Sequence, residues 1–242
     1  SQNARAQKGA GQMKPSLLVV EDDPDINGLL CELLRKQGYL AQAAFSGSEA
    51  LLRLEKQVYH TVLVDLMLPG LPGEQLVQEI RKSSTVPVIV ISAKSGQTTK
   101  VELLQSGADD FITKPFDTDE VAARVAAQLR RYLTFGQGDG DRQVLRYGGL
   151  VLNTGLHEAR LKEATLALTG IEFELLALLL RTPNKVFTKA NLFESVWETP
   201  FLGEDNTLNV HISNLRAKLA EADPENRYIE TVWGIGYRMA KK

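Results

Sequence analysis

The feature that most constrains the fold is an alternation of short apolar runs with amphipathic segments in the first half of this 242-residue chain. The apolar runs occupy residues 17–20, 41–44, 61–65, 87–92 and 111–113. Each run has the length and composition of a buried strand, and each precedes a segment of helical periodicity. Five such units in succession predict a parallel sheet covered by helices on both faces. We therefore expect an α/β domain of flavodoxin-like (βα)5 type over residues 13–133.

The pattern changes after residue 133. Residues 134–142 hold three glycines and little apolar material, which is typical of a linker. The segments beyond it are four short alternating runs between residues 144 and 168, helical patterns at 170–181, 189–197 and about 206–221, and two strands around a turn at 233–236. Helices followed by a terminal hairpin predict a winged helix-turn-helix domain over residues 143–242.

Composition excludes several classes of protein. No apolar run approaches the roughly 18 residues of a membrane span, and no secretory signal is visible. The single cysteine, Cys31, can form no disulfide within the chain, which fits a reducing compartment. We expect a cytoplasmic protein without a membrane partner. Residues 1–12 are small and polar, and we expect them to be an expression remnant ahead of a natural start at Met13.

Charged and polar side chains follow the predicted strands. Glu21 and Asp22 follow the first strand, Asp65 ends the third, Ser92 ends the fourth and Lys114 follows the fifth. The carboxyl ends of parallel strands meet at one edge of a sheet, so these side chains are expected to converge there. Crowded carboxylates favour a hard cation with oxygen ligands, and Mg²⁺ is the natural candidate. Asp65 would then be a nucleophile toward phosphorus. Capping of the following turn is its alternative role.

The segments VVEDD, LVDLMLPG, VIVISA and ITKPF, in this order, resemble the receiver domain of bacterial response regulators. The resemblance implies that Asp65 accepts a phosphoryl group from a sensor histidine kinase, with self-catalysed transfer only and no other enzymatic activity. It also implies a cis peptide before Pro115. The further residues that it implicates are the metal-binding Glu21, Asp22 and the backbone carbonyl of Met67, the catalytic Lys114, and the switch pair Ser92 and Phe111. Phe111 stands where many relatives have tyrosine.

The segments LTGIEFELLALLLRTPNKVFTKANLFESVW, NTLNVHISNLRAKL and IETVWGIGYRM resemble the winged-helix domain of the OmpR/PhoB subfamily. The helix at 206–221 is then expected to enter a major groove of double-stranded DNA, with the hairpin turn beside it. The candidate DNA contacts are Asn209, His211, Ser213, Asn214, Arg216, Lys218, Trp233 and Arg238. His211 could instead face the core, and Arg216 and Lys218 could form a solvated face. Because acidic residues match basic ones in number after Gln143, the salt dependence of binding should be shallow.

The resemblance also implies a homodimer formed on phosphorylation. It places three charge pairs across a two-fold axis: Lys100 with Glu120, Asp110 with Arg124, and Asp109 with Arg131. RNA polymerase is a further candidate partner. Two alternatives stay open beside this transcriptional regulator. One is an orphan regulator that is never phosphorylated, which the complete acidic pocket disfavours. The other is a phosphohydrolase with an aspartyl nucleophile, which Met67 disfavours because such enzymes usually place a second acid at that position.

Overall fold

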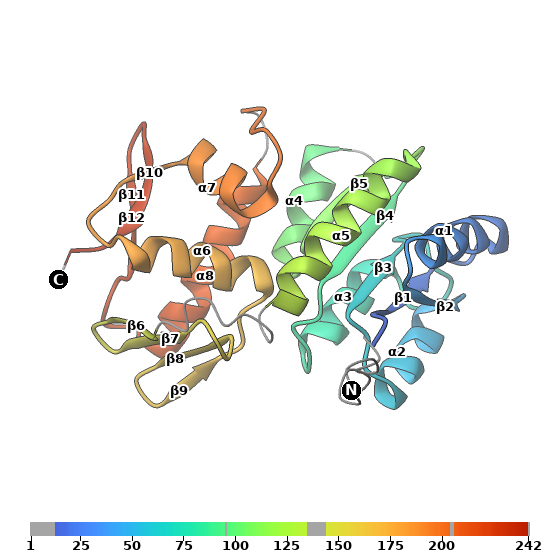
Figure 1. Ribbon diagram of the computed structural model, residues 1–242, viewed down its shortest axis with the longest axis horizontal. Coiled ribbons are helices and arrows are strands. Elements are labelled where there is room, and N and C mark those ends of the chain that lie inside the picture. Colours follow the sequence, from blue (N-terminus) through green and yellow to red (C-terminus); the bar gives the residue numbers. More distant parts are fainter. Residues whose placement is uncertain (1–12, 95, 135–143, 204–205, 242) are drawn as a thin grey trace, which may run out of the picture.

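The structure is a computed structural model that describes residues 13–94, 96–134, 144–203 and 206–241. The chain forms two units that lie side by side, with the N-terminal unit on the right in Figure 1. Its elements are β1 (Ser16–Val20), α1 (Pro24–Lys36), β2 (Leu40–Ala44), α2 (Gly47–Lys56), β3 (Thr61–Val64), α3 (Gly73–Arg81), β4 (Val88–Ser92), α4 (Gln97–Gln105), β5 (Asp110–Thr113) and α5 (Thr118–Thr134).

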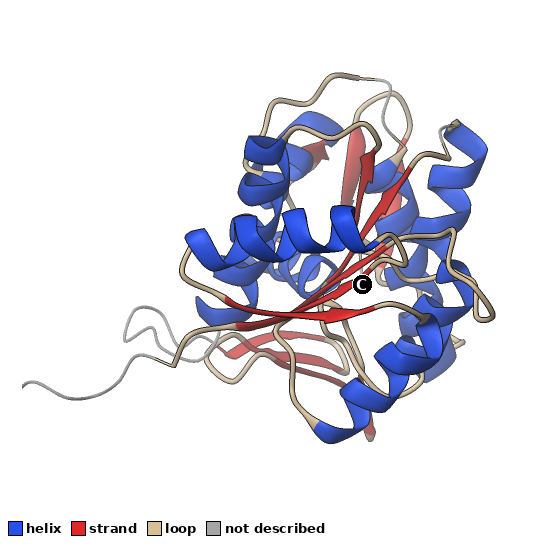
Figure 2. Ribbon diagram, turned by 90° about the vertical axis from the view of Figure 1, so that its right-hand side faces the viewer, coloured by secondary structure: helices blue, strands red, loops and turns tan. Residues whose placement is uncertain are grey.

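The five strands of the N-terminal unit form one parallel sheet in the order β2-β1-β3-β4-β5. Successive residues of β1 face opposite sides: Leu17 packs with the apolar residues of α1 and α5, and Leu18 with those of α2, α3 and α4. Helices therefore cover both faces of the sheet, as Figure 2 shows. The flavodoxin-like fold predicted from the alternating pattern is confirmed.

The C-terminal unit has two antiparallel sheets around three helices. Its elements are β6 (Val144–Tyr147), β7 (Leu150–Asn153), β8 (Glu158–Leu161), β9 (Ala164–Leu166), α6 (Gly170–Arg181), β10 (Phe187–Thr188), α7 (Lys189–Trp197), α8 (Thr207–Ala222), β11 (Ile229–Val232) and β12 (Gly236–Met239). The sheets have the orders β6-β7-β8-β9 and β10-β12-β11. One apolar core lies between them and the helices. The predicted winged helix-turn-helix is confirmed.

Two details differ from the sequence expectation. The strand expected up to Leu168 ends at Leu166, because Thr169 begins α6 with a capping box in which Thr169 and Glu172 bond each other's backbone. The two-residue strand β10 was not predicted. It pairs with β12 so closely that a Cβ on Gly236 would lie 1.9 Å from the Phe187 carbonyl oxygen.

The two units contact each other through helices. α4 and α5 of the first unit lie against α8 and α6 of the second. α5 runs to Thr134, so most of the predicted linker lies outside the described residues, as do residues 1–12, and the domain limits stay predictions. Among the described residues, no helix is long and apolar enough to cross a membrane.

Candidate functional site

Four of the predicted residues lie at the carboxyl edge of the parallel sheet. Asp65 directly follows β3, where its N–H donates to the Val20 carbonyl at 2.9 Å, and its side chain is buried. Glu21, directly after β1, is 3% exposed. Ser92 ends β4 and is also fully buried, and Lys114 follows β5. The convergence predicted from strand ends is therefore present, because the order β1-β3-β4-β5 makes these strands neighbours.

The Lys114 ammonium joins the two buried acids. It lies 2.6 Å from Glu21 Oε2 and also bonds Asp65 Oδ2, and it precedes a cis peptide to Pro115, as predicted. Burial acts against its charge, but the bonds to Asp65 and Glu21 outweigh this and raise the pKa of Lys114. Burial also raises the pKa of Glu21 to about 7, with Asp65 adding to the rise and Lys114 opposing it. The buried pocket thus disfavours a second carboxylate charge, which a further cation would relieve.

The oxygen donors suit a hard cation, but their arrangement is looser than predicted. Asp22 is exposed, and within the described ranges no three acidic, histidine or cysteine side chains stand together as a metal-ligating group. The ammonium of Lys114 lies between Glu21 and Asp65 instead. Met67 is 60% exposed. Its N–H donates to Asp65 Oδ1 at 2.6 Å, so the loop that carries the Met67 carbonyl is bonded to the nucleophile.

Two residues that shape this pocket were missed from the sequence. The Asn27 amide, buried on α1, donates to the carbonyls of Glu21 and Ala44 at 3.0 and 3.1 Å and so fixes the ends of β1 and β2. A Cβ on Gly73 would lie 2.5 Å from the Asp65 carbonyl oxygen, so only glycine allows this approach. The signal for Asn27 was a polar residue within an apolar helical stripe.

The predicted switch pair lies inside the domain. The Ser92 hydroxyl accepts the Lys94 N–H at 3.1 Å. Phe111 is 7% exposed and belongs to an apolar cluster that contains Leu104 of α4 and Val210 of α8. The aromatic ring is thus buried in a cluster that includes a residue of the other domain.

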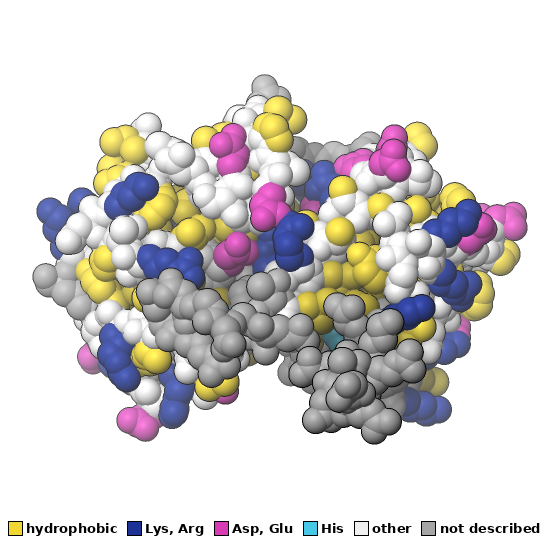
Figure 3. All heavy atoms as spheres, viewed as in Figure 1, with side chains coloured by type: hydrophobic (Ala, Val, Ile, Leu, Met, Phe, Trp, Pro, Cys, Tyr) yellow, Lys and Arg dark blue, Asp and Glu magenta, His cyan; other side chains and the backbone are white. Residues whose placement is uncertain are grey.

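Three of the cations expected to contact DNA are engaged within the C-terminal domain. Arg216 donates to the Ile229 carbonyl at 3.2 Å and the Thr231 hydroxyl at 2.9 Å. Lys218 lies 2.6 Å from Glu172, and Arg238 pairs with Glu230. In Figure 3 both basic and acidic side chains occur on the described part of the visible face. Arg216 and Lys218, expected to contact DNA or to form a solvated face, are half-buried and bonded within their own domain, and their contact with DNA stays a prediction.

The other candidate readers divide into an exposed and a covered group. Ser213 is exposed, Asn209 accepts a hydrogen bond from the Tyr237 hydroxyl at 2.8 Å, and Trp233 at the hairpin turn is 89% exposed. His211 and Asn214 contact the receiver-like unit instead. His211 was expected to face either DNA or the core, and it lies between the two units, 2% exposed.

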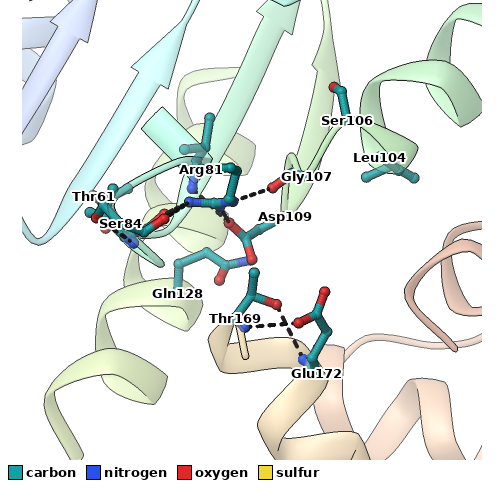
Figure 4. A network of polar contacts seen from close by, with 12 residues as sticks. Thr61, Arg81, Ser84, Leu104, Ser106, Gly107, Asp109, Gln128, Thr169 and Glu172 are labelled. Atoms are coloured by element: carbon teal, nitrogen blue, oxygen red, sulfur yellow. Dashed lines mark hydrogen bonds and ion pairs between the residues drawn. The ribbon is translucent and has the colours of Figure 1, made fainter. Parts of the chain in front are cut away.

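The residues of the expected dimer face have partners within the chain. Arg124 binds Asp110 at 2.8 Å and Glu120 at 3.0 Å. The Asp109 carboxylate lies 2.7 Å from Arg81, which also donates to the Gly107 carbonyl, as Figure 4 shows. Arg131 lies 2.5 Å from Glu174 of α6. Lys100 is half-buried on α4. Asp109 and Arg131 are therefore buried here, and their pairing across a two-fold axis stays a prediction.

Replacing Arg216 with alanine is expected to lower the stability of the C-terminal domain by about 1–2 kcal/mol, because hydrogen bonds from a charged donor to β11 are lost at a half-buried site. Both tryptophans lie in this domain, so urea unfolding followed by their fluorescence measures the change. The exposed Arg227→Ala is the control and should change stability little. Equal stability of the Arg216→Ala and wild-type proteins would contradict this role.

The sequence matches two protein families, described as "Response regulator receiver domain" over residues 17–126 and "Transcriptional regulatory protein, C terminal" over residues 163–239. It is 37% identical to regulatory protein VanRc of Enterococcus gallinarum over 95% of this chain and all of that protein. It is 41% identical to the uncharacterized transcriptional regulatory protein YrkP of Bacillus subtilis over 92% of this chain and 96% of that one.

A solved structure of a RitR mutant is similar over both units. It has a TM-score of 0.75 at 26% sequence identity, covering 94% of this chain and 100% of that one. Each unit is only about half of the chain, so a TM-score of 0.75 requires that the two units are placed similarly in both proteins.

Proposed function

This chain belongs to the two-component response regulators of OmpR/PhoB type, with a receiver domain and a DNA-binding domain, and on that premise we propose that Mg²⁺-dependent phosphorylation of Asp65 controls its dimerisation and its binding to DNA. The observation that carries the proposal is the pocket in which Asp65, Glu21 and Lys114 meet at the carboxyl edge of the sheet. The family consists of transcriptional regulators rather than classical enzymes, which sets the phosphohydrolase alternative aside.

The transfer step follows from the pocket. A carboxylate oxygen of Asp65 attacks phosphorus, the bond from phosphorus to the donor's leaving group breaks, and an acyl phosphate forms. The donor is a phosphohistidine of the sensor kinase or a small phosphodonor. Lys114 already contacts Asp65 and would pair with a phosphoryl oxygen, and the Ser92 hydroxyl would donate to another. Mg²⁺, held by Glu21, Asp22, Asp65 and the Met67 carbonyl, would neutralise charge on the phosphoryl group.

The DNA-binding proposal centres on α8 and the hairpin turn. A helix fits the major groove, where asparagine and serine side chains can read base edges. Asn209, Ser213 and Asn214 would act as readers. Trp233 projects from the turn with 89% of its surface exposed and would contact the neighbouring sugar-phosphate backbone. Arg216, Lys218 and Arg238 bind partners in their own domain, so these three cations are already engaged, which supports a shallow salt dependence.

Phosphorylation is expected to produce a symmetric dimer through α4, β5 and α5. An isologous interface contains each charge pair twice, so reversing one charge disrupts two contacts. With acetyl phosphate and Mg²⁺, Arg124→Glu should weaken the dimer, and the double variant Asp110→Arg with Arg124→Glu should partly restore it. Light scattering measures the fraction of dimer. A protein concentration on the order of tens of micromolar suits weak association.

Lys36→Glu is a matched control, because Lys36 lies on α1 with 72% of its side chain exposed, away from the proposed interface. It should leave the dimer unchanged. A wild-type protein that takes up the phosphoryl group yet stays monomeric would count against the dimer, as would equal dimerisation of Arg124→Glu.

A further inference from the structure

The tip of the hairpin formed by β11 and β12 presents apolar side chains to solvent. Trp233 is 89% exposed, and Ile235, two residues later, is 52% exposed. Figure 1 shows this hairpin on the side of the DNA-binding domain that faces away from the receiver domain. An indole in water gains from any partner that covers its apolar surface, so this tip has the character of a binding surface.

The hairpin offers no free charge to a partner. Arg238 is the one basic residue between Ile229 and Met239. It lies opposite Glu230 on the neighbouring strand, and the two side chains form an ion pair. A hairpin that recognised DNA by charge would present a cation at its tip, because a narrow minor groove concentrates negative potential. The side chains at this tip provide apolar surface and an indole N–H instead.

The backbone fixes the conformation of the tip. The Ile235 N–H donates to the Val232 carbonyl at 3.0 Å, and Gly234 has a φ of 75°, which the third residue of a type II turn requires. Behind the turn, Gly236 packs against the Phe187 carbonyl of β10, so β12 is held from its other side as well. A side chain on such a turn loses little freedom of the backbone on binding, which favours insertion into a tight site.

The hairpin is tied to the helix that is proposed to read DNA. The Tyr237 hydroxyl of β12 donates to the Asn209 side chain of α8 at 2.8 Å. Arg216 of α8 donates to the Thr231 hydroxyl of β11 at 2.9 Å, and its guanidinium lies over the Tyr237 ring, 5.3 Å from the ring centroid. When α8 lies in a major groove, these contacts bring the tip to the DNA beside that groove.

We propose that Trp233 enters the minor groove as an apolar wedge, with Ile235 beside it, and partly unstacks one base step, so that the bound duplex is bent. The DNA surfaces that can cover an indole are the sugar edges and the faces of the bases, because the phosphates are charged. A base face becomes available only where a step opens, and pyrimidine–purine steps open at the least cost. This goes beyond the backbone contact proposed for Trp233, and it rests on the DNA-binding role proposed for α8.

Insertion would make the hairpin a reader of DNA deformability rather than of base edges. The energy needed to unstack a step depends on its sequence, so a preference for TA or CA/TG should arise at a position that α8 does not touch. Salt should affect this contact little, since no cation of the tip replaces a counterion.

The test uses the full chain, treated with acetyl phosphate and Mg²⁺, and a duplex selected from a random pool with the phosphorylated protein. Fluorescent dyes at the two ends of the duplex report bending through energy transfer. The wild-type protein should raise the transfer. Trp233→Ala should leave it near that of free DNA and should weaken binding by about tenfold, the order expected for the loss of one stacked ring.

Two further variants separate apolar insertion from other contacts. Trp233→Arg should also lose the bend, but the salt dependence of its binding should steepen by about one unit of slope, because the arginine would neutralise a phosphate. Trp233→Phe keeps an apolar ring and should retain part of the bend. Leu156→Ala is the matched control, because Leu156 is a 65% exposed apolar residue at the turn between β7 and β8. It should change neither the bend nor the affinity.

Equal bending by the wild-type protein and Trp233→Ala, or bending by neither, would overturn the proposal and leave the DNA-binding role of α8 standing. If Trp233→Ala binds and bends DNA normally but loses transcription by purified RNA polymerase from the selected site, the tip binds a protein and the proposal is wrong. If no duplex is enriched, the proposed function fails and the inference fails with it. Far-UV circular dichroism of each variant should show an intact fold, because Trp233 is exposed.

Discussion

Asp65→Asn is expected to abolish phosphoryl incorporation from acetyl phosphate, and chelation of Mg²⁺ is expected to abolish it in the wild-type protein. Asparagine keeps the size of the side chain and a carbonyl oxygen that can accept the Met67 N–H, but it lacks the anionic oxygen that attacks phosphorus. The effect is a complete loss, because no other carboxylate stands at the end of β3. Intact-protein mass spectrometry of freshly treated protein measures it.

The exposed Asp119→Asn on α5 is the matched control and should incorporate phosphate like the wild-type protein. If Asp65→Asn still gains the mass of a phosphoryl group, the assignment of Asp65 as the nucleophile is wrong. Full phosphoryl incorporation in excess chelator would contradict the proposed requirement for Mg²⁺. Thermal unfolding of each variant without phosphodonor separates loss of chemistry from loss of fold.

Acidification is expected to weaken the contact between α8 and the receiver domain. Burial between the two domains lowers the pKa of His211 to about 4, whereas an exposed histidine has a pKa near 6.5. The neutral ring therefore favours the contact. This contribution is complete above pH 6.5 and is lost as the pH falls toward 4. Between pH 7.5 and 5.5 the ratio of protein with joined domains to protein with separated domains should fall about tenfold, since one pKa unit corresponds to about 1.4 kcal/mol.

The groups around His211 support this direction. Three cations near the ring disfavour a positive charge on His211: Arg131 of α5, Arg81 of α3 and Lys218 of α8. The Nδ1 atom of His211 has no hydrogen-bond partner among the described residues. Burial raises the pKa of the Asp109 carboxyl of β5 to about 6, so acidification would favour the buried state of this group, opposite to its effect on His211. Its partners Arg81 and the Val88 N–H belong to the receiver, however, so they stay with Asp109 when the domains separate.

Asn214→Ala removes the hydrogen bond to the Leu104 carbonyl and so weakens the contact between the two domains. In this background, small-angle scattering measures their separation through the radius of gyration. The radius should increase from pH 7.5 to pH 5.5. His211→Gln in the same background keeps a polar side chain that does not titrate, and it should remove the dependence on pH. An unchanged radius across this range, or an equal change with His211→Gln, would contradict the role of His211.

The fold and the phosphorylation pocket were accessible from sequence for a physical reason. Burial on both faces makes each parallel strand an uninterrupted apolar run, and the residue that ends such a run must lie at the carboxyl edge of the sheet. Asp65 and Lys114 could thus be placed without knowledge of any contact. Asn27 and Gly73 support the same pocket, but their roles depend on where backbone from another element passes, which no local pattern records.

The roles of the long cations and of the domain interface were not accessible in this way. Arg216 and Arg131 look alike in sequence, each a basic residue on an amphipathic helix. In the structure one ties α8 to β11 and the other ties α5 to α6. Their partners are carbonyls and carboxylates that are distant in sequence, so only the packed chain brings them within reach. His211 is a further case, because its burial requires both domains.

The central claim is that phosphorylation of Asp65 controls binding to DNA. The most direct measurement is the affinity for a duplex selected from a random pool with the phosphorylated protein, titrated with and without acetyl phosphate and Mg²⁺. The wild-type protein should bind more tightly with phosphodonor, and Asp65→Asn should stay weak under both conditions. Equal affinity of the wild-type protein with and without a phosphoryl group on Asp65 would contradict the account.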